Sequence, residues 1–487
     1  MTSRRAALAV RIASAYTLSR RPGGTIHETF APLANPGFRT LCISTFAWNV
    51  ARWMEMTITS WVALQLTGSP WLVGMVAVAR TAALPVSGPI MGALSDRIDR
   101  LQMIRSSGWV NVIVMGSVAA ALVAGHGAYW QLLVGSLWLG ASWGIDWPVR
   151  RSLLAEYVGP ERVLPAIVLD NVAFNIARVA GPLIAGAALE AWDAPGAYVV
   201  LAFSFLVASL SVWTVEAPPS RVVPVRVPGS PPPKRPSLWR DLRAGVAYAR
   251  ADPVMSGVIV ISLVMNVLLF QYQGMLSVFA DEVLHVGPVE LGALGAATGV
   301  GAAFSVFLQP LFRSTRAQGL AFTIGSIVGG VALVLFSVSN GYVAALLLLF
   351  VVGAGTSSFG TMQSSLILSR SSPAMRGRAM GLVTLAIGSA PLGSLQLGYL
   401  ADTVGVSMAI GISSALSLIL VMGFGMHFGM FGRNLVGVPV PLREGESVDP
   451  GTGVGFPPPP SRLTGAGEAT EGLLSPVPGR TGDRSVP

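Results

Sequence analysis

Residues 41–66 read LCISTFAWNVARWMEMTITSWVALQL, and the next apolar stretch, residues 71–94, reads WLVGMVAVARTAALPVSGPIMGAL. Each stretch is longer than the ~20 residues that a helix needs to cross the hydrocarbon core of a bilayer. Such stretches recur with short polar connections, and twelve are predicted: 41–66, 71–94, 107–124, 129–154, 164–189, 197–215, 254–279, 291–311, 319–338, 342–368, 379–400 and 407–431. The chain is therefore predicted to be an all-α integral membrane protein.

The composition supports a membrane protein and excludes several other classes. Of 487 residues, 52% are hydrophobic and only 11% are charged, unlike a soluble domain. The net charge of +9 comes from arginines in loops rather than from a basic face with interleaved aromatics, so no nucleic-acid partner is expected. The only lysine, Lys234, precedes Arg235, which excludes a phosphate-binding loop, and the histidines form no metal pattern. We predict no enzyme, cofactor or metal site.

The charges of the loops predict the orientation. Every second loop carries arginines, such as Arg97, Arg150 and Arg313, whereas the opposite loops carry none and hold acids such as Glu190 and Asp281. The positive-inside rule then places both termini in the cytoplasm and the chain in the inner (cytoplasmic) membrane. The predicted parts are a basic tail (1–36), a first six-helix bundle (37–215), a linker (216–250), a second bundle (251–431) and a disordered Pro-rich tail (432–487).

The two bundles are predicted to be repeats of each other. At one constant offset Pro36 pairs with Pro253 and Asn49 pairs with Asn266, and one residue later in register Pro70 pairs with Pro288. The fourth helices align in the same way through Gly140 with Gly353 and Pro160 with Pro373. Parallel repeats of this kind place the substrate path at their interface near the middle of the membrane.

Two short motifs carry a resemblance to a known family. The loop after the second helix reads GALSDRIDR and contains Gly92, Asp96, Arg97 and Arg100, and the fifth helix contains Gly181, Pro182 and Gly186. From about residue 35 to 431 the chain resembles the major facilitator superfamily, and within it the branch of enterobactin-exporter-like and macrolide-efflux-like transporters. The resemblance implies a twelve-helix secondary transporter in two pseudo-symmetric bundles.

The family's motifs suggest two roles, each with a plainer alternative. The loop residues are expected to form a cytoplasmic charge latch that opens during alternating access, although an ordinary positive-inside loop would look similar. The glycines of helix 5 are expected to pack as in antiporters, although small residues favour close packing in any membrane helix. Asp99 replaces the usual glycine of the loop motif, and DWPVRR at 146–151 replaces the helix 4 pattern of many proton-coupled members.

Charged residues within the predicted helices are confined to the first half. They are Glu55, Asp146 and Asp170 with Arg52, Arg80, Arg150 and Arg178, and their repeat partners are neutral. A charge in hydrocarbon costs at least ~2.5 kcal/mol, so these groups should face one another or water. We predict Glu55 or Asp146 as the proton site and the other five as buried charge partners. Alternatively, all are ion pairs that hold the helices together.

The second half offers a polar but neutral lining for a substrate. The candidates are Asn266, Gln271, Tyr272 and Gln363, which suit an amphipathic ligand. The predicted function is proton-coupled export of a small drug-like or siderophore-like compound, with protons, the substrate and the bilayer as partners of a monomer. Proton-coupled uptake, or a sensor or scaffold that transports nothing, is the alternative.

Overall fold

The computed structural model describes residues 30–83, 98–215, 238–308, 314–372, 375–431, 447–448 and 455–456. The helical residues belong to one compact unit, and the residues from Val438 onward belong to another. The basic tail up to residue 29, the residues Gly92, Asp96 and Arg97 of the predicted latch, and the linker up to residue 237 lie outside the described part.

The first half contains the first six predicted spans. Its elements are η1 (Ala31–Ala34), α3 (Pro36–Thr67), α4 (Pro70–Ala82), α6 (Arg100–Val123), α7 (Tyr129–Val158), η2 (Pro160–Arg162) and α8 (Val163–Trp213). α8 holds two spans, because its backbone leaves the helical region at Trp192 and Asp193, where φ of Asp193 is 52°. This break lies in the turn predicted between residues 189 and 197.

The second half contains the other six spans. Its elements are α9 (Leu238–Arg250), α10 (Pro253–Val264), η3 (Met265–Leu269), η4 (Phe270–Met275), α11 (Leu276–Glu282), α12 (Pro288–Leu308), α13 (Thr315–Ser337), α14 (Tyr342–Arg370), α15 (Arg376–Ile387), α16 (Ala390–Val404) and α17 (Val406–His427). The end of the predicted linker thus forms a helix, α9, which packs against α15 and α10.

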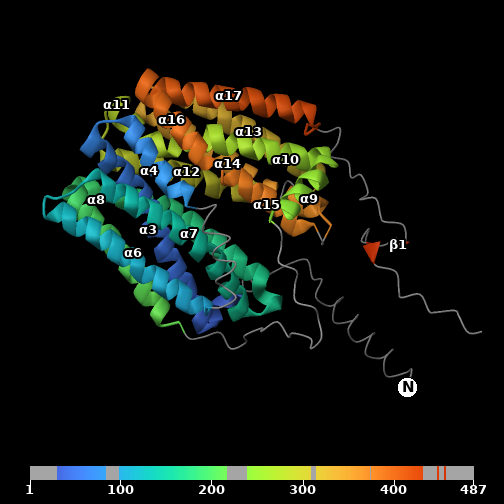
Figure 1. Cartoon of the computed structure of the whole chain (residues 1–487), viewed down its shortest axis with the longest axis horizontal. Coiled ribbons are helices and arrows are strands. Elements are labelled where there is room, and N and C mark those ends of the chain that lie inside the picture. Colours follow the sequence, from blue (N-terminus) through green and yellow to red (C-terminus); the bar gives the residue numbers. More distant parts are fainter. Residues whose placement is uncertain are drawn as a thin grey trace, which may run out of the picture. The chain divides into compact units, whose positions relative to one another are not determined.

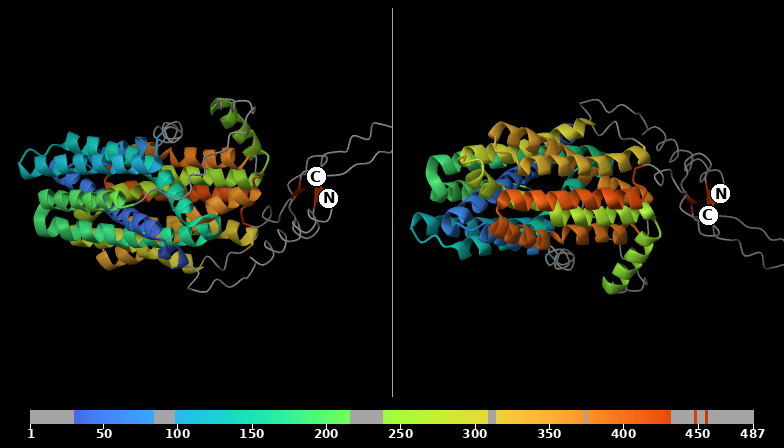
Figure 2. Two further views of the ribbon diagram at one scale, coloured as in Figure 1. Left: turned by 90° about the horizontal axis from the view of Figure 1, so that it is seen from below. Right: turned by 90° about the horizontal axis from the view of Figure 1, so that it is seen from above.

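The twelve-helix prediction is confirmed. In the described part of the chain, eight helical segments are long and apolar enough to span a membrane, and one of them, α8, supplies two spans. The helices α3, α4 and α7 bring the total of eight plus one to twelve. Figure 2 shows these helices running along a common direction.

The C-terminal unit contains one short hairpin among its described residues. β1 (Ser447–Val448) and β2 (Gly455–Phe456) pair antiparallel, with Ser447 opposite Phe456. The sequence between the strands contains Asp449, Pro450 and Gly451, which are typical turn residues.

Equivalent helices of the two halves begin in the same way. Asn35 caps α3 by accepting a hydrogen bond from the Phe38 backbone N, and Pro36 occupies the first turn. Asp252 caps α10 in the same position before Pro253. A proline suits the first turn because its missing N–H would have no helical partner there. The repeat therefore sets where these helices start.

The two halves meet along α4 with α16 and along α8 with α12, and Figure 1 shows α4 and α16 close together. A Cβ on Gly74 would lie 2.9 Å from Cα of Gly398, and a Cβ on Gly186 would lie 2.3 Å from the carbonyl oxygen of Pro288. Only glycine permits backbones to approach this closely. These contacts depend on the absence of a side chain at each glycine. We call them the glycine seam.

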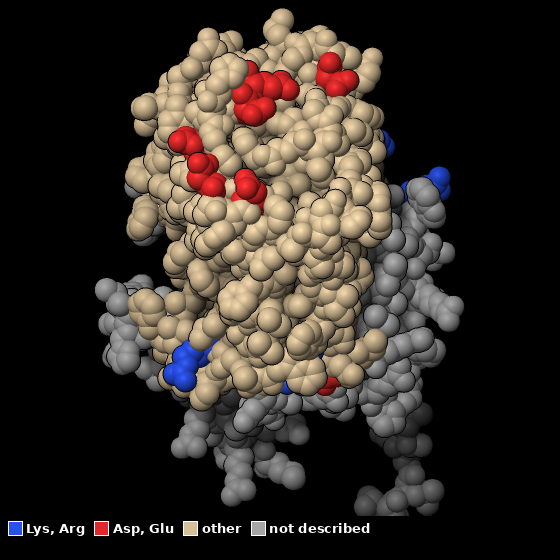
Figure 3. Space-filling model, turned by 90° about the vertical axis from the view of Figure 1, so that its left-hand side faces the viewer, with Lys and Arg blue, Asp and Glu red and all other residues tan. Residues whose placement is uncertain are grey.

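The glycine seam lies near one end of the bundle, which we call the acidic end. Next to it, Ser69 Oγ of the first half donates a hydrogen bond to Asp402 Oδ1 of the second half, at 3.0 Å. Figure 3 views the molecule from the left of Figure 1 and shows acidic side chains gathered on that face. The acidic end is defined by Glu190, Asp193, Asp281, Glu282, Glu290 and Asp402.

Candidate functional site

Glu55 lies at the junction of three helices of the first half. Its side chain is 2% exposed, and its Oε1 accepts hydrogen bonds from Arg80 Nη2 at 3.1 Å and from Ser136 Oγ at 3.0 Å. These partners come from α4 and α7, whereas Glu55 belongs to α3. The carboxylate therefore joins α3 to α4 and α7, and a change in its charge would alter the contacts among all three helices.

Asp146 lies in a different environment, inside the first half between α6 and α7. Its Oδ2 accepts hydrogen bonds from Ser107 Oγ and Ser142 Oγ, both at 3.1 Å. Asn111 extends the cluster by donating to Ser142 Oγ at 3.0 Å. Asp146 is completely buried. These contacts hold its carboxylate against α6.

Arg150 is one turn further along α7 and is also buried. Its Nη1 donates to Ser44 Oγ at 3.1 Å and to Thr45 Oγ1 at 3.3 Å, both on α3. Asp170 on α8 pairs with Arg151, with 3.7 Å between Nε and Oδ2. The structure thus brings Asp146, Arg150 and Asp170 into networks that connect α3, α6, α7 and α8, which agrees with a structural role for these charges.

Arg52 and Arg178 contact aromatic rings instead of carboxylates. The Arg52 guanidinium lies 3.6 Å from the ring centroid of Trp143, and that of Arg178 lies 5.4 Å from the ring centroid of Trp53. Arg52 is one turn from Glu55 on α3, but the Glu55 carboxylate forms its ion pair with Arg80 of α4. The sequence identified both arginines and gave no indication of their tryptophan partners, because those contacts join residues distant in sequence.

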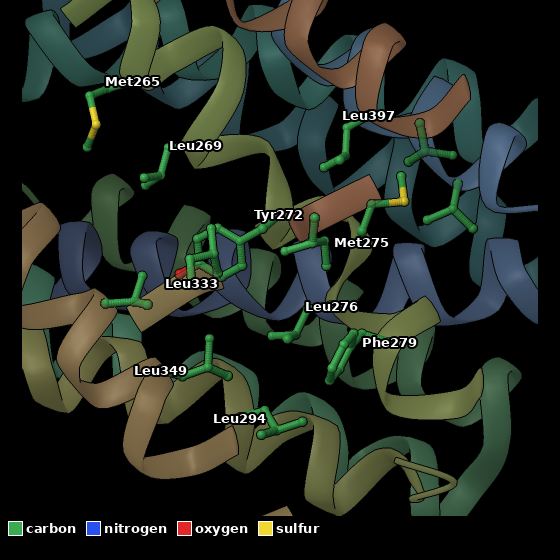
Figure 4. Packing of buried hydrophobic residues seen from close by; sticks show 14 of the residues in the cluster. Met265, Leu269, Tyr272, Met275, Leu276, Phe279, Leu294, Leu333, Leu349 and Leu397 are labelled. Carbon is green, nitrogen blue, oxygen red and sulfur yellow. The ribbon is translucent and has the colours of Figure 1, made fainter. Parts of the chain in front are cut away.

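The four candidate lining residues of the second half make hydrogen bonds or packing contacts within that half. Asn266 Nδ2 donates to the Ser262 carbonyl at 2.8 Å, and Gln271 Nε2 donates to the Asn266 carbonyl at 2.7 Å. Gln363 donates to Ser262 Oγ. Tyr272 is 1% exposed and belongs to the same packed cluster as Leu269 and Leu349, shown in Figure 4.

These hydrogen bonds lie at a break in the seventh predicted span, residues 254–279, which the sequence did not predict. The predicted span 254–279 is an α-helix only at its ends, since residues Met265–Leu269 form a π-helical turn and Phe270–Met275 form a 3-10 helix. Such turns leave carbonyls without their usual helical donors, and Gln271 supplies a donor to one of them. Two glutamines followed by Gly274 within an apolar span were the available signal.

Of the predicted latch, only Arg100 is described. It begins α6, and its Nη1 donates to Ser152 Oγ at 2.7 Å and forms an ion pair with Glu156, both on α7. Asp99, the departure from the family's loop motif, caps α6 by accepting from the Leu101 backbone N at 2.8 Å. The latch itself stays a prediction. Glu156 was not among the predicted site residues.

The helix 5 motif lies against both halves. A Cβ on Gly181 would lie 2.5 Å from Trp53 Cβ on α3, so this glycine lets two helices of the first half approach. The Pro182 carbonyl and Gly186 instead contact α12 of the second half, where a Cβ on Gly292 would lie 2.5 Å from the Pro182 oxygen. Pro182 lies within α8 with no break in its helical dihedrals. The motif therefore forms part of the glycine seam.

Comparison with known proteins agrees with this arrangement. The sequence model of the family described as Major Facilitator Superfamily matches residues 41–394. The chain belongs to the major facilitator superfamily. It is 24% identical over 373 residues to the enterobactin exporter of Shigella boydii serotype 4, covering 74% of this chain and 85% of that one. It is 19% identical over 384 residues to the staphyloferrin A transporter of Staphylococcus aureus, covering 78% of this chain and 94% of that one.

Solved structures of the same fold are more distant in sequence. One is a bacterial homologue of the human lysosomal transporter Spinster in an inward-facing, occupied conformation, with a TM-score of 0.66, 13% identity, and coverage of 84% of this chain and 99% of that one. Another is the nucleoside transporter NupG, with a TM-score of 0.63, 14% identity, and coverage of 81% and 99%. Membership of this superfamily, together with the match to named transporters, makes the chain a multi-pass membrane transporter of small molecules rather than an enzyme.

Proposed function

We propose that this superfamily member is a proton-coupled exporter of a small siderophore-like compound. Two of its relatives carry the names enterobactin exporter and staphyloferrin A transporter, and both are matched over most of their length. The observation that supports proton coupling most directly is the buried ion pair of Glu55 and Arg80. It joins three helices of one half, and α4, which supplies Arg80, also packs against α16 of the other half.

Protonation of Glu55 would change the contacts of α4. A neutral carboxyl attracts Arg80 far less than a carboxylate does, and the low polarity of the surroundings makes that difference large. α4 contributes to the glycine seam through Gly74. A weakened Glu55–Arg80 contact would therefore shift the equilibrium between conformations in which the seam is closed and conformations in which it is open. Asp146 is the weaker candidate, because its hydroxyl partners lie on α6 and α7 and not on α4, which packs against α16 of the other half.

The orientation belongs to the same proposal. Arginines such as Arg100, Arg370 and Arg376 lie at helix ends opposite the acidic end, so the positive-inside rule supports cytoplasmic termini and an inner-membrane location. We further propose that a monomer suffices, since both walls of the substrate path come from one chain, as expected for paired six-helix repeats.

The test uses everted membrane vesicles that contain the full-length protein and a panel of siderophores. Addition of a transported siderophore should release protons from acidified vesicles, as measured with a pH-sensitive dye. Glu55→Gln should abolish this proton release while the protein remains folded and binds substrate. Glu161→Gln is the matched control, because Glu161 is exposed. Full proton release with the Glu55→Gln variant would rule out Glu55 as the proton site.

A further inference from the structure

Two arginines in the membrane-spanning part of the first half form no ion pair among the described residues, and both lie over tryptophan rings. Glu55 is paired with Arg80, Asp170 with Arg151, and Asp146 accepts from two serines. In the described part of the chain, neither Arg52 nor Arg178 makes a hydrogen bond or an ion pair; their contacts are with tryptophan rings. A cation in hydrocarbon is costly unless it is paired or faces water, so both arginines require an explanation.

The tryptophans beside these arginines also offer indole donors without acceptors. The Nε1 atoms of Trp53 and Trp143 are buried and have no hydrogen-bond partner among the described residues. Trp53 follows Arg52 on α3, and Phe174 of α8 lies edge-on to Trp53 with 6.1 Å between ring centroids. We call Arg52, Trp53, Trp143, Phe174 and Arg178 the arginine–aromatic face. Every one of these side chains is only partly buried.

A guanidinium that stacks on an indole keeps its N–H groups available. The ring covers the flat face of the cation, and the donors point outward in the plane, where they match the oxygens of a carboxylate or phenolate. The two guanidiniums of this face therefore provide donors and positive charge, and the two indoles provide further donors. Among the described residues, these four groups have no hydrogen-bonded acceptor.

The second half cannot supply an acceptor with negative charge from its own helices. Its membrane-spanning sequence contains no Asp or Glu between residues 254 and 280, between 291 and 401, or between 403 and 431. Arg178 lies at the contact between the halves, because a Cβ on Gly299 of α12 would lie 3.2 Å from the Arg178 carbonyl oxygen. The membrane-spanning sequence of the second half therefore offers no carboxylate to either arginine, and a bound ligand would supply the acceptor that both lack among the described residues.

We propose that the substrate is a small aromatic anion that the arginine–aromatic face binds. Its carboxylate or phenolate oxygens accept from Arg52 and Arg178, and its ring packs against Trp53, Trp143 and Phe174. This assignment rests on the proposed transport function and adds the chemical class of the substrate. It also gives Arg52 and Arg178 a role in binding, distinct from the ion pairs that hold the helices together.

The experiment measures binding with three probes of one skeleton and different charge. The probes are naphthalene-2,6-dicarboxylate, 2-naphthoate and 2-naphthamide, and binding to the full-length protein in lipid nanodiscs is measured by calorimetry. The dianion should bind most tightly and the amide most weakly. Arg52→Gln and Arg178→Gln should each weaken binding of the dianion about tenfold, as expected for the loss of a charge-assisted hydrogen bond. The affinity for the amide should not change.

A matched control separates this site from any arginine–tryptophan pair. Arg105 lies 5.0 Å from the ring centroid of Trp213, but it donates to the carbonyls of Trp213 and Val215 at 3.3 Å and 2.8 Å. Arg105→Gln should leave all three affinities unchanged. If a glutamine variant fails to fold, Arg52→Lys and Arg178→Lys keep the charge and should retain part of the preference for anions.

Several outcomes would overturn the proposal. They are equal affinity for the three probes, no binding of any probe, and an unchanged preference for anions in both arginine variants. Competition by chloride alone with no preference among the probes would identify a simple halide site instead. The result is independent of proton coupling, because it is a binding measurement without a gradient. A failed proton-release experiment would therefore leave this assignment standing, and the reverse also holds.

Discussion

Glu55 and Asp146 are both buried carboxylates of the first half, yet their partners differ in kind. Glu55 shares one oxygen between an arginine and a serine from two neighbouring helices. Asp146 accepts from serine hydroxyls, and Arg150 one turn away is held by hydroxyls of α3. A proton on Glu55 removes the charge that opposes Arg80 of α4, whereas a proton on Asp146 disturbs a network between α6 and α7. We therefore propose a coupling role for Glu55 and a structural role for Asp146.

This difference predicts distinct results for two conservative variants. Asp146→Asn should lower the thermal unfolding temperature of the purified protein and leave proton release per transported substrate unchanged, because it removes the charge nearest Arg150. Glu55→Gln should abolish proton release; it should also lower the unfolding temperature, because it leaves the buried Arg80 without its partner. Unfolding followed by tryptophan fluorescence, together with the vesicle assay, measures both. Loss of proton release with Asp146→Asn at unchanged stability would transfer the coupling role to Asp146.

At the scale of elements, sequence reasoning succeeded where local signals are strong. The paired prolines Pro36, Pro70, Pro253 and Pro288 indicated the repeat, and α3, α4, α10 and α12 begin at them. It failed where the outcome depends on packing between distant segments. The break in the span 254–279 lies where Gly393 of α16 approaches so closely that a Cβ would lie 2.1 Å from the Val267 carbonyl oxygen. No local pattern in that span contains this contact.

The glycine seam gives a prediction for elements rather than single sites. Gly186→Ala adds a Cβ that would lie 2.3 Å from the Pro288 oxygen, so α8 and α12 must separate. We expect a loss of stability of about 1–3 kcal/mol, typical of overpacking, together with slower transport. Gly423→Ala in α17 is the control, since nothing lies within 4 Å of its Cβ position. Equal behaviour of the two variants in thermal unfolding and transport would show that the seam tolerates a methyl group.

At the scale of the whole molecule, the sequence was sufficient for the fold and insufficient for the site. Twelve spans and two halves follow from hydropathy and from repeated prolines, both of which are local properties. The candidate site required the structure, because Glu55 pairs with Arg80 rather than with Arg52, and because Arg52 and Arg178 lie on Trp143 and Trp53. Charges within the predicted spans identified the candidate residues, but the packing of the helices determines which side chains they contact.

The orientation of the whole bundle gives the last prediction. Acids gather at the end that carries Glu190, Asp281 and Asp402, and arginines lie at the opposite helix ends. Translocation across the membrane favours arginine-rich loops remaining inside. Reporter domains fused after Val215 and after Phe431 should therefore be cytoplasmic, whereas one inserted near Gly196, beside the break of α8, should be external. An alkaline phosphatase fusion active after Val215 would reverse the orientation, and with it the direction in which a proton gradient drives the substrate.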